Sequence, residues 1–449
     1  MTSARSVAFL TLRDIDRRSS YTDVAIDRAL KHHDLSALDR GLVTELVYGV
    51  IRHQRTLDCL METLGDRPIE KQPPDLRRIV QLGLYQLRYL DQIPASAAVN
   101  TSVALAKAQG LKGLSKVVNG MLRRYERGQA EGMDFLPTTA NPIQQLGQKY
   151  SFPDWIIDLF QQQWGGEETE ALCQYFNPPP SLDLRVNPLK ASRNQVIQAF
   201  AELNLPATAI AGLSQGLRIQ AKTGAIPQLP GFQEGWWTVQ DASAQWVGPV
   251  LDPQPGEIIF DVCAAPGGKT THLAELMGNQ GQIWAGDRTA SRLQKVATLQ
   301  QRLGLTAIKT WQGDLTQADL PPVQNVDRAL LDVPCSGLGT LHRNPDLRWR
   351  QTPENIRQTL IPLQWQLLTA IAPLVKSGGS LVYSTCTLNP AENQDQIQQF
   401  LNTHRDWQTE SFPWMDTQGQ SQIMTNGMLT ILPHHHRQDG FFIAKLKKA

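Results

Sequence analysis

From about residue 236 onward, short apolar runs alternate with helical patterns, and this alternation restricts the fold more than any other feature of the sequence. The runs are Ile258–Val262, Ile283–Ala285, Ala329–Val333 and Ser380–Tyr383. Short, bounded runs separated by helices are typical of a parallel sheet covered on both faces. We therefore predict an α/β domain with a mostly parallel sheet over residues 236–449. Because such sheets bind ligands at the carboxyl ends of their strands, functional residues are expected directly after these runs.

The first half of the chain has a different pattern. Residues 1–140 read as helical up to about residue 130 and end in the loop-like stretch EGMDFLPTTANP (131–142), which lacks apolar periodicity. In residues 145–235, prolines bracket the alternating apolar residues of 182–186, a pattern that favours a short strand after an initial helix. With 449 residues, several domains are expected. We predict an all-α domain over 1–140, a small α+β connecting region over 145–235, and the α/β domain described above.

Composition excludes several classes of protein. A hydrophobic content of 41% and a charged content of 19% are those of a globular chain, and no apolar run is long enough to cross a bilayer. The N-terminus lacks the apolar stretch of a secretory signal, so we expect a cytoplasmic protein that is not bound to a membrane. The sequence suggests no partner subunit, and we expect a monomer.

The five cysteines are far apart and odd in number, which argues against both a zinc site and a disulfide framework. They are Cys59, Cys173, Cys263, Cys335 and Cys386. The run HHHR (434–437) suggests a metal site, but it precedes the DGFF strand in what we expect to be a loop, and we predict no metal there. We therefore expect free thiols whose function, if any, is chemical.

Charge alone does not indicate a nucleic-acid partner, because the net charge is only +1. Arginines nevertheless cluster at IRHQR (51–55), LRRI (76–79) and MLRRYERG (121–128). Such clusters can belong to an RNA-binding surface, but more often they are simply solvated helix faces.

The first apolar run leads into DVCAAPGGKTTHLAEL (261–276). Pro266, Gly267 and Gly268 predict a tight turn, followed by a helix from Lys269 to Leu276. A turn of small residues lets a ligand approach the backbone, and a helix N-terminus favours a carboxylate. The pattern is not GxGxxG, and for a bare turn a purely structural role is equally acceptable.

Three aspartates follow later strands: Asp287 in GDR, Asp314 in WQGD and Asp332 in LLDVPC. An acidic residue roughly twenty positions after a glycine turn accepts hydrogen bonds from ribose hydroxyls in nucleotide-binding folds. Each aspartate alone is also compatible with a helix cap or a turn. Together, at the ends of strands in one sheet, they indicate a ligand with a sugar and a base.

Cys335 in DVPCSGLGT and Cys386 in LVYSTCTLNPAEN also follow apolar strands directly. A buried, inert side chain is the usual fate of cysteine. Two cysteines beside small polar residues at strand ends favour a chemical role instead.

The strings DVCAAPGGKT, DVPCSG, STCTLNPAEN and DGFF (439–442) together resemble the RNA cytosine-C5 methyltransferases. TVQDASAQ (238–245) and RNPDLRW (343–349) narrow the resemblance to the Sun type, which acts on bacterial 16S rRNA and carries a helical domain similar to NusB. LVYGVIR (46–52) and VNGMLRR (118–124) are the weaker matches in the helical region. The resemblance covers essentially the whole chain. It implies a Rossmann-like methyltransferase domain, a NusB-like RNA-binding domain over 1–140, an RNA-binding role for the connecting region over 145–235, and 16S rRNA as partner.

By this resemblance Cys386 is the nucleophile, Cys335 helps release the product, and Asp332 acts on the target base. The implied cofactor is S-adenosyl-L-methionine, and the residues implied to hold it are Cys263, Ala264, Ala265, Pro266, Gly267, Gly268, Lys269, Asp287, Asp314 and Asp332. Cys263 belongs to the cofactor loop and is not counted as a third catalytic thiol.

The implied reaction requires a thiolate at Cys386, because thiolate attack on carbon 6 of cytosine raises the electron density at carbon 5. We hypothesise that Lys269 or Arg343 supplies the positive charge that favours this thiolate. A carboxyl group near ring nitrogen 3, for which Asp332 is the candidate, can relieve the developing charge. The target base must be unstacked, and the helical domain is expected to hold flanking RNA through its phosphates.

Three alternatives remain. The same chemistry acts on tRNA or another RNA; the protein is a non-catalytic RNA-binding or assembly factor; or Cys335 and Cys386 form a reversible disulfide in a redox enzyme. The presence of Cys335, Cys386 and Asp332 together argues against the second alternative.

Overall fold

The computed structural model describes residues 3–65, 67–221, 223–317, 319, 321–416 and 419–449. The chain forms two compact units. The first comprises Met1–Pro178 together with Leu341–Arg350, and the second comprises Pro179–Thr340 and Gln351–Ala449. Each unit has its own fold.

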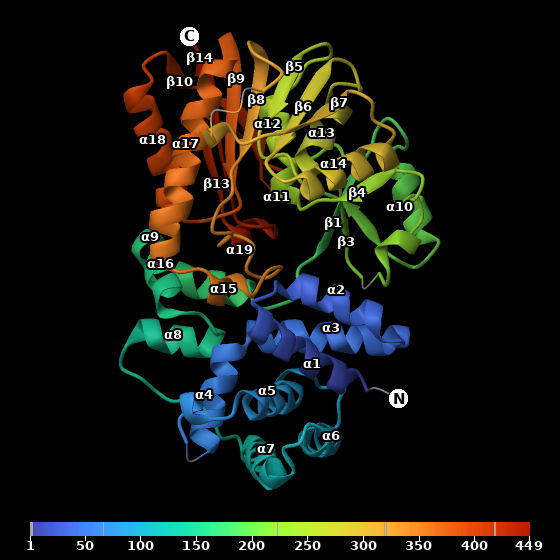
Figure 1. The fold of residues 1–449 in the computed structure, drawn as a ribbon, viewed down its shortest axis with the longest axis vertical. Coiled ribbons are helices and arrows are strands. Elements are labelled where there is room, and N and C mark those ends of the chain that lie inside the picture. The colour runs from blue at the N-terminus through green and yellow to red at the C-terminus, as the bar shows by residue number, and fades with distance from the viewer. Residues whose placement is uncertain (1–2, 66, 222, 318, 320, 417–418) are drawn as a thin grey trace. The chain divides into compact units, whose positions relative to one another are not determined.

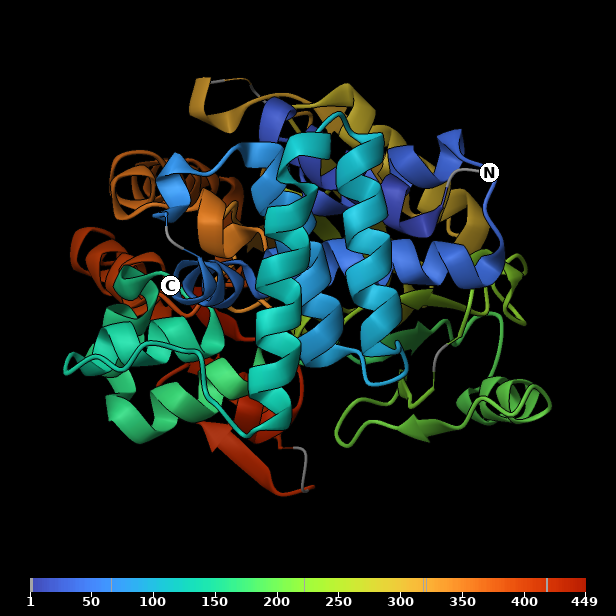
Figure 2. The ribbon, with the colours of Figure 1, turned by 90° about the horizontal axis from the view of Figure 1, so that it is seen from below.

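The first unit is helical, as predicted for residues 1–130. Its elements are α1 (Ala4–Arg18), α2 (Thr22–His32), α3 (Ala37–Arg52), α4 (Gln54–Leu64), η1 (Ile69–Lys71), α5 (Pro74–Tyr89), α6 (Ala95–Ala108), η2 (Lys112–Leu114), α7 (Ser115–Ala130), α8 (Pro142–Tyr150), α9 (Asp154–Tyr175) and α15 (Leu347–Arg350). Ser3 and Ser36 cap α1 and α3 by accepting backbone N–H bonds. Apolar stripes of α1, α3, α4, α5 and α7 form one core. Figure 2 looks onto this unit, with α6 and α7 side by side.

The segment Leu341–Arg350 comes from the second half of the sequence but packs inside the first unit. Arg348 is wholly buried there, and its guanidinium donates to the backbone carbonyls of Arg52 (3.1 Å), Ser151 (3.0 Å) and Phe176 (3.0 Å). The guanidinium carbon also lies 3.8 Å from the centre of the Phe152 ring. This arginine therefore fastens the segment to the helices around it.

The second unit is built on one large sheet (Figure 1). Its strands are β5 (Ile258–Asp261), β6 (Gln282–Asp287), β7 (Ile308–Gln312), β8 (Val326–Asp332), β9 (Val375–Thr385), β10 (Trp407–Thr409), β13 (Met428–Ile431) and β14 (Phe441–Lys448). The order is β10-β14-β9-β8-β5-β6-β7, with β13 on β14. Strands β5 to β9 run parallel, and β14 is antiparallel to β9. The predicted mostly parallel sheet and its four apolar strands are confirmed.

Helices cover both faces of this sheet. The helices and helical turns of this part of the second unit are α11 (Ala242–Gln245), α12 (Val247–Leu251), α13 (Gly268–Leu276), α14 (Ala290–Leu303), η4 (Leu315–Gln317), α16 (Pro353–Asn355), the π-helical turn η5 (Ile356–Leu360), α17 (Ile361–Ile371), η6 (Ala372–Leu374), η7 (Pro390–Glu392), α18 (Gln394–Thr403) and α19 (Pro433–His436). Leu273 of α13 and Val296 of α14 pack in one core, and Leu368 of α17 and Phe400 of α18 in the other. The strand order reverses between β5 and β8, the position where sheets of this kind bind ligands.

A smaller antiparallel sheet precedes the large one, in the order β2-β3-β1-β4. Its elements are β1 (Leu182–Val186), α10 (Arg193–Ala201), β2 (Ala207–Ala209), β3 (Gly216–Ile219), η3 (Ile226–Gln228) and β4 (Trp237–Val239). Trp237 and Phe200 are buried in the core of this sheet. A separate hairpin consists of β11 (Phe412–Met415) and β12 (Ser421–Met424). The strand expected at residues 182–186 is therefore present.

The boundaries of the two compact units differ from those of the three expected domains, because residues 145–178 and 341–350 belong to the first unit. The three domain ranges stay a prediction. Throughout the part of the chain that the structure describes, no helix has both the length and the apolar character needed to span a membrane.

Candidate active site

The two cysteines singled out by the sequence follow neighbouring strands. β8 and β9 pair in parallel, with Asp332 opposite Ser384. Cys335 lies three residues beyond the end of β8, and Cys386 directly follows β9. Their Sγ atoms are 3.4 Å apart. The structure thus brings the two thiols into contact at the carboxyl edge of the sheet.

The two thiols differ in acidity. The pKa of Cys386 is lowered because Cys335 donates a hydrogen bond to its sulfur, and the charge of Lys269 acts in the same direction against burial. The pKa of Cys335 is raised well above its ordinary value, first by its hydrogen bond to Cys386 and then by burial. Cys386 is therefore the sulfur that loses its proton first.

Asp332 ends β8 beside these thiols. Its Oδ2 accepts a hydrogen bond from Lys269 Nζ at 2.7 Å, and its Oδ1 accepts one from Ser384 Oγ at 2.8 Å. Lys269 Nζ also lies 5.1 Å from the centre of the Phe441 ring. Burial alone lowers the pKa of Lys269, but the charge and hydrogen bond of Asp332 outweigh it, so the pKa is raised. Lys269 therefore stays positively charged at neutral pH.

The backbone is closely packed around Cys386. Gly339 N–H donates to the Cys386 carbonyl at 2.9 Å, and Gly440 N–H donates to the Gly339 carbonyl at 2.8 Å. A Cβ atom on Gly339 would lie 1.9 Å from the Gly440 oxygen. A Cβ atom on Gly440 of the DGFF string would in turn lie 2.7 Å from the Gly339 Cα atom, so this close approach requires glycine at both positions.

The loop from Cys263 to Lys269 joins β5 to α13. Gly267 has φ of +106°, and a Cβ atom there would lie 3.1 Å from the backbone of Val296. Its N–H donates to the Ala264 carbonyl at 2.8 Å. Because α13 begins at Gly268, the unpaired N–H groups of its first turn lie at the end of this loop. The predicted strand, tight turn and helix are all present.

Sequence reasoning missed Asp261, the last residue of β5. Its side chain is buried and accepts a hydrogen bond from Thr270 Oγ1 at 2.6 Å. Burial, helped by the charges of Asp332 and Asp287, raises the pKa of Asp261 to about 7. The signal was available, because Asp261 ends an apolar strand directly before the glycine turn, as Asp332 ends its own strand.

The two remaining aspartates have different surroundings. Asp287 ends β6, is buried, and forms an ion pair with Arg292 at 3.2 Å. Asp314 follows β7, the outer strand of the sheet, and its Oδ1 accepts from the N–H and the hydroxyl of Thr316 at 2.9 and 2.7 Å. This is the local turn geometry that is common for aspartate. The structure groups Asp287 with Asp261 and Asp332, whereas a ligand-binding role for Asp314 stays a prediction.

Cys263 lies in the loop between β5 and α13 and is half-buried. Burial raises its pKa well above the ordinary value, and the charge of Asp261 adds to this effect. A protonated thiol is a weak nucleophile, so Cys263 has the environment of an unreactive cysteine.

A buried arginine from the small sheet holds α13. Arg185 of β1 donates through Nε and Nη2 to the carboxylate of Glu275 at 2.9 Å, and both side chains are wholly buried. It also donates to Thr271 Oγ1 at 2.9 Å and to the Gly268 carbonyl at 2.5 Å. Removing one partner of such a pair leaves an uncompensated buried charge. The position of α13 therefore depends on the small sheet.

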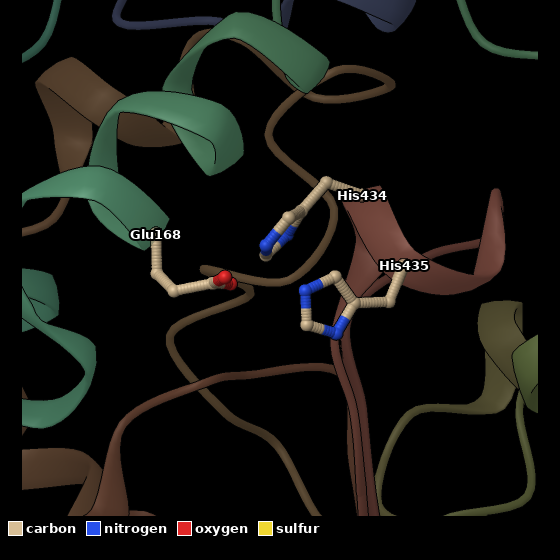
Figure 3. A group of neighbouring side chains, drawn as sticks. All are labelled: Glu168, His434 and His435. Atoms are coloured by element: carbon tan, nitrogen blue, oxygen red, sulfur yellow. The ribbon is translucent and has the colours of Figure 1, made fainter.

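The HHHR run forms the short helix α19 and not the loop that the sequence suggested, because Pro433 starts a helical turn that ends at Arg437 with φ of +51°. His434 and His435 extend from α19 with ring centres 4.2 Å apart (Figure 3). The expectation that no metal binds there stays a prediction.

Of the two cations proposed to favour the thiolate, Lys269 acts on Cys386. Arg343 falls in the segment that belongs to the first unit. Its role stays a prediction.

Three family models match the chain. Residues 2–127 match the NusB family, residues 152–225 match a ferredoxin-like domain of the RsmF/B-like methyltransferases, and residues 249–447 match 16S rRNA methyltransferase RsmB/F. A Synechocystis protein named "Probable ribosomal RNA small subunit methyltransferase B" is 73% identical over 450 residues, which cover 100% of both chains. The chain belongs to the RsmB/F family of 16S rRNA methyltransferases.

More distant proteins also match along the whole chain. A Bacillus subtilis protein with the same printed name is 34% identical over 100% of this chain and 99% of its own length. The solved structure titled "Crystal Structure of PH0851" has a TM-score of 0.80 and 28% identity, and the match covers 99% of this chain and 98% of that one. The predicted family and fold class are confirmed: a NusB-like helical domain, a ferredoxin-like connector and a Rossmann-like methyltransferase domain.

Proposed function

We propose that this member of the RsmB/F family transfers a methyl group from S-adenosyl-L-methionine to carbon 5 of a cytosine in 16S rRNA, with Cys386 as covalent nucleophile. The observation that supports this most strongly is the contact between the two Sγ atoms at 3.4 Å. One thiol of the pair is made more acidic and the other less acidic. Such a pair suits a reaction in which one sulfur bonds to the base while the other keeps its proton.

The loop from Cys263 to Lys269 fits the cofactor. A Cβ atom on Gly268 would make only an ordinary van der Waals contact, with Gln240 Nε2 at 3.9 Å, so neighbouring side chains do not crowd the start of α13. The N-terminal N–H groups of α13 suit a carboxylate, and Asp287 offers acceptors for ribose hydroxyls. When bound there, S-adenosyl-L-methionine supplies an electrophilic methyl group. Asp314 is part of this proposal on the family resemblance alone.

The protein residues act on the base in a definite order. The Cys386 thiolate forms a bond to carbon 6 of cytosine, which places electron density on carbon 5. Lys269 and Asp332, joined at 2.7 Å, provide a charged pair that can supply a proton to ring nitrogen 3. After carbon 5 is methylated, a base removes its proton, the ring electrons return, and the bond between carbon 6 and Cys386 breaks. Cys335 is positioned to assist this last step.

The RNA must present an unstacked cytosine, since the thiols lie at the edge of a sheet and cannot enter a duplex. Of the arginines in the three clusters, Arg52 and Arg78 are buried and make internal hydrogen bonds, so they are not placed to bind phosphate. We expect the exposed arginines of α7, Arg124 and Arg127, to bind flanking phosphates, and this contribution weakens as salt concentration rises.

The decisive experiment compares wild type with Cys386→Ala and Cys335→Ala on 16S rRNA, using labelled cofactor and a denaturing gel. We expect no methylation with Cys386→Ala, and with Cys335→Ala a stalled covalent RNA–protein complex that migrates slowly. A complex that forms with Cys386→Ala and not with Cys335→Ala reverses the two assignments. The same assay on separated rRNA and tRNA fractions identifies the class of RNA.

The distance of 3.4 Å between the sulfurs also favours the redox alternative. That alternative requires a Cys335–Cys386 disulfide to form reversibly in the working cycle, with no methyl transfer. Wild-type methylation of RNA under fully reducing conditions excludes it.

A further inference from the structure

Glu392 is a wholly buried carboxylate that the proposed reaction does not use. It is the last residue of the three-residue turn η7 (Pro390–Glu392), which follows the loop that carries Cys386. Its Oε1 accepts hydrogen bonds from the Ser336 N–H at 2.8 Å and from Gln364 Nε2 at 3.0 Å. Both donors are N–H groups, so this oxygen acts as an acceptor in both bonds.

The other carboxylate oxygen connects the two cysteine loops. Oε2 accepts from Ser336 Oγ at 2.5 Å, from Asn389 Nδ2 at 3.1 Å and from Thr387 Oγ1 at 3.4 Å. The Ser336 and Thr387 hydroxyl oxygens are themselves 2.6 Å apart. Ser336 directly follows Cys335, and Thr387 directly follows Cys386. One side chain therefore binds the residue next to each thiol.

Neighbouring elements fix Glu392 itself. Tyr383 Oη of β9 donates to the Glu392 backbone carbonyl at 2.7 Å. Gln364 of α17 donates through the same Nε2 to the Pro334 carbonyl at 3.0 Å, directly before Cys335. The carboxylate is thus held between β9, α17 and the loop after β8.

We propose that Glu392 is a positioning residue that holds the Cys335 and Cys386 loops together and so sets the distance between their Sγ atoms. This rests on the proposed function, in which that distance matters for the reaction. Five donors converge on the two oxygens, and a neutral amide replaces one acceptor oxygen with a donor. In Glu392→Gln the new amide N–H group therefore faces other hydrogen-bond donors in a buried site. Because donors cannot bond to one another, one of the two cysteine loops must move.

The charge of Glu392 and its positioning of the loops have opposite effects on the pKa of Cys386, so an experiment can distinguish them. The negative charge of Glu392 raises the pKa of both thiols. If Glu392 acted by charge alone, Glu392→Gln would make Cys386 more acidic. If it acts by position, the substitution breaks the hydrogen bond from Cys335 and makes Cys386 less acidic.

The first measurement is the rate at which diamide joins Cys335 to Cys386, followed by mass spectrometry of the linked peptides. The two thiols lose two electrons and two protons, which diamide takes up as the S–S bond forms. Glu257→Gln is the matched control, because Glu257 accepts from Arg328 at 2.7 Å just before β5, at the opposite end of the strands. We expect the rate to fall about tenfold or more in Glu392→Gln and to stay unchanged in Glu257→Gln.

The second measurement is the pH profile of Cys386 alkylation by iodoacetamide, with S-adenosylhomocysteine binding as a test of the cofactor loop. We expect the alkylation midpoint of Glu392→Gln to move to higher pH, with the affinity for S-adenosylhomocysteine within about twofold of wild type. A folded Glu392→Gln protein that forms the disulfide as fast as wild type overturns the proposal, and so does a midpoint that moves to lower pH.

If Glu392→Gln does not fold, Ser336→Ala and Glu392→Asp replace it. Ser336→Ala removes one donor from Oε2, and Glu392→Asp keeps the charge but shortens the reach. Both are expected to slow disulfide formation, and unchanged rates in both contradict the proposal. Because the diamide assay needs neither RNA nor cofactor, a failure of the proposed methyl transfer leaves its result standing, and the two failures are distinguishable.

Discussion

The proposed cofactor loop (residues 263–269) and the two cysteine loops meet at one edge of the sheet but are held in different ways. Residues 263–269 take their shape from the backbone, through the positive φ of Gly267 and the start of α13 at Gly268. The cysteine loops after β8 and β9 depend on side chains that converge on Glu392. The first arrangement depends mainly on backbone conformation, whereas the second depends on each donor being matched.

The difference also separates what each region contributes. A backbone loop that is not crowded at Gly268 is suited to receive a ligand, and a network of buried side chains is suited to hold two reactive atoms at a fixed distance. Lys269 belongs to the first region and contacts Asp332 of the second. A substitution of Lys269 therefore affects both regions at once.

Of the three substitutions, Asp261→Asn is expected to change the free energy of unfolding most, and the size of this change depends on pH. The folded protein raises the pKa of Asp261 from 3.8 to about 7, so the folded state binds the proton that the unfolded state loses. Its stabilising contribution is complete below pH 4 and is lost as pH rises through 7. Between pH 5 and pH 8 the free energy of unfolding of wild type should fall by about 3 kcal/mol relative to Asp261→Asn. Urea unfolding followed by tryptophan fluorescence measures this, and parallel pH curves would contradict it.

Gly339→Ala tests the tight packing of the cysteine loops. Its Cβ atom would lie 1.9 Å from the Gly440 oxygen, so the backbone must move. We expect a loss of about 1–3 kcal/mol in the free energy of unfolding. Gly268→Ala is the control in the loop from Cys263 to Lys269, because its Cβ would make only an ordinary van der Waals contact, and we expect a change within about 0.5 kcal/mol without ligand. Equal losses in the two variants would show that the regions do not differ in packing.

Lys269→Met is expected to have the smallest effect of the three when the free protein is measured. It removes the cation that lowers the pKa of Cys386, so alkylation of Cys386 at pH 7.5 should slow by less than about tenfold and its midpoint should move to higher pH. The hydrogen bond from Cys335 is the larger cause and remains. An alkylation profile identical to that of wild type would show that Lys269 does not act on the thiol.

The features that could be predicted from the sequence are those that depend on residues close together in the chain. Apolar runs located the strands, and glycines located the turn before α13, because these patterns depend on neighbouring residues only. Cys386 and Asp332 could be placed at the sheet edge for the same reason. Asp261 was equally accessible from its position at a strand end but was overlooked.

Long-range partners could not be predicted in the same way. Gln364 and Glu392 are on different helices, and Arg185 reaches Glu275 from another sheet. The HHHR run also became a helix, since Pro433 can start a turn whose sequence pattern is too short to recognise. These features arise from tertiary packing, which a single sequence does not display.

The placement of Leu341–Arg350 has a consequence for synthesis of the protein. The ribosome makes residues 1–178 first, but the buried site for Arg348 among their carbonyls stays without its arginine until residue 348 has emerged. Domains usually fold as they leave the ribosome, N-terminal first. Here we expect the helical unit to reach its final stability only after the first strands of the methyltransferase sheet have been made, so that neither unit can be produced whole by a single cut in the gene.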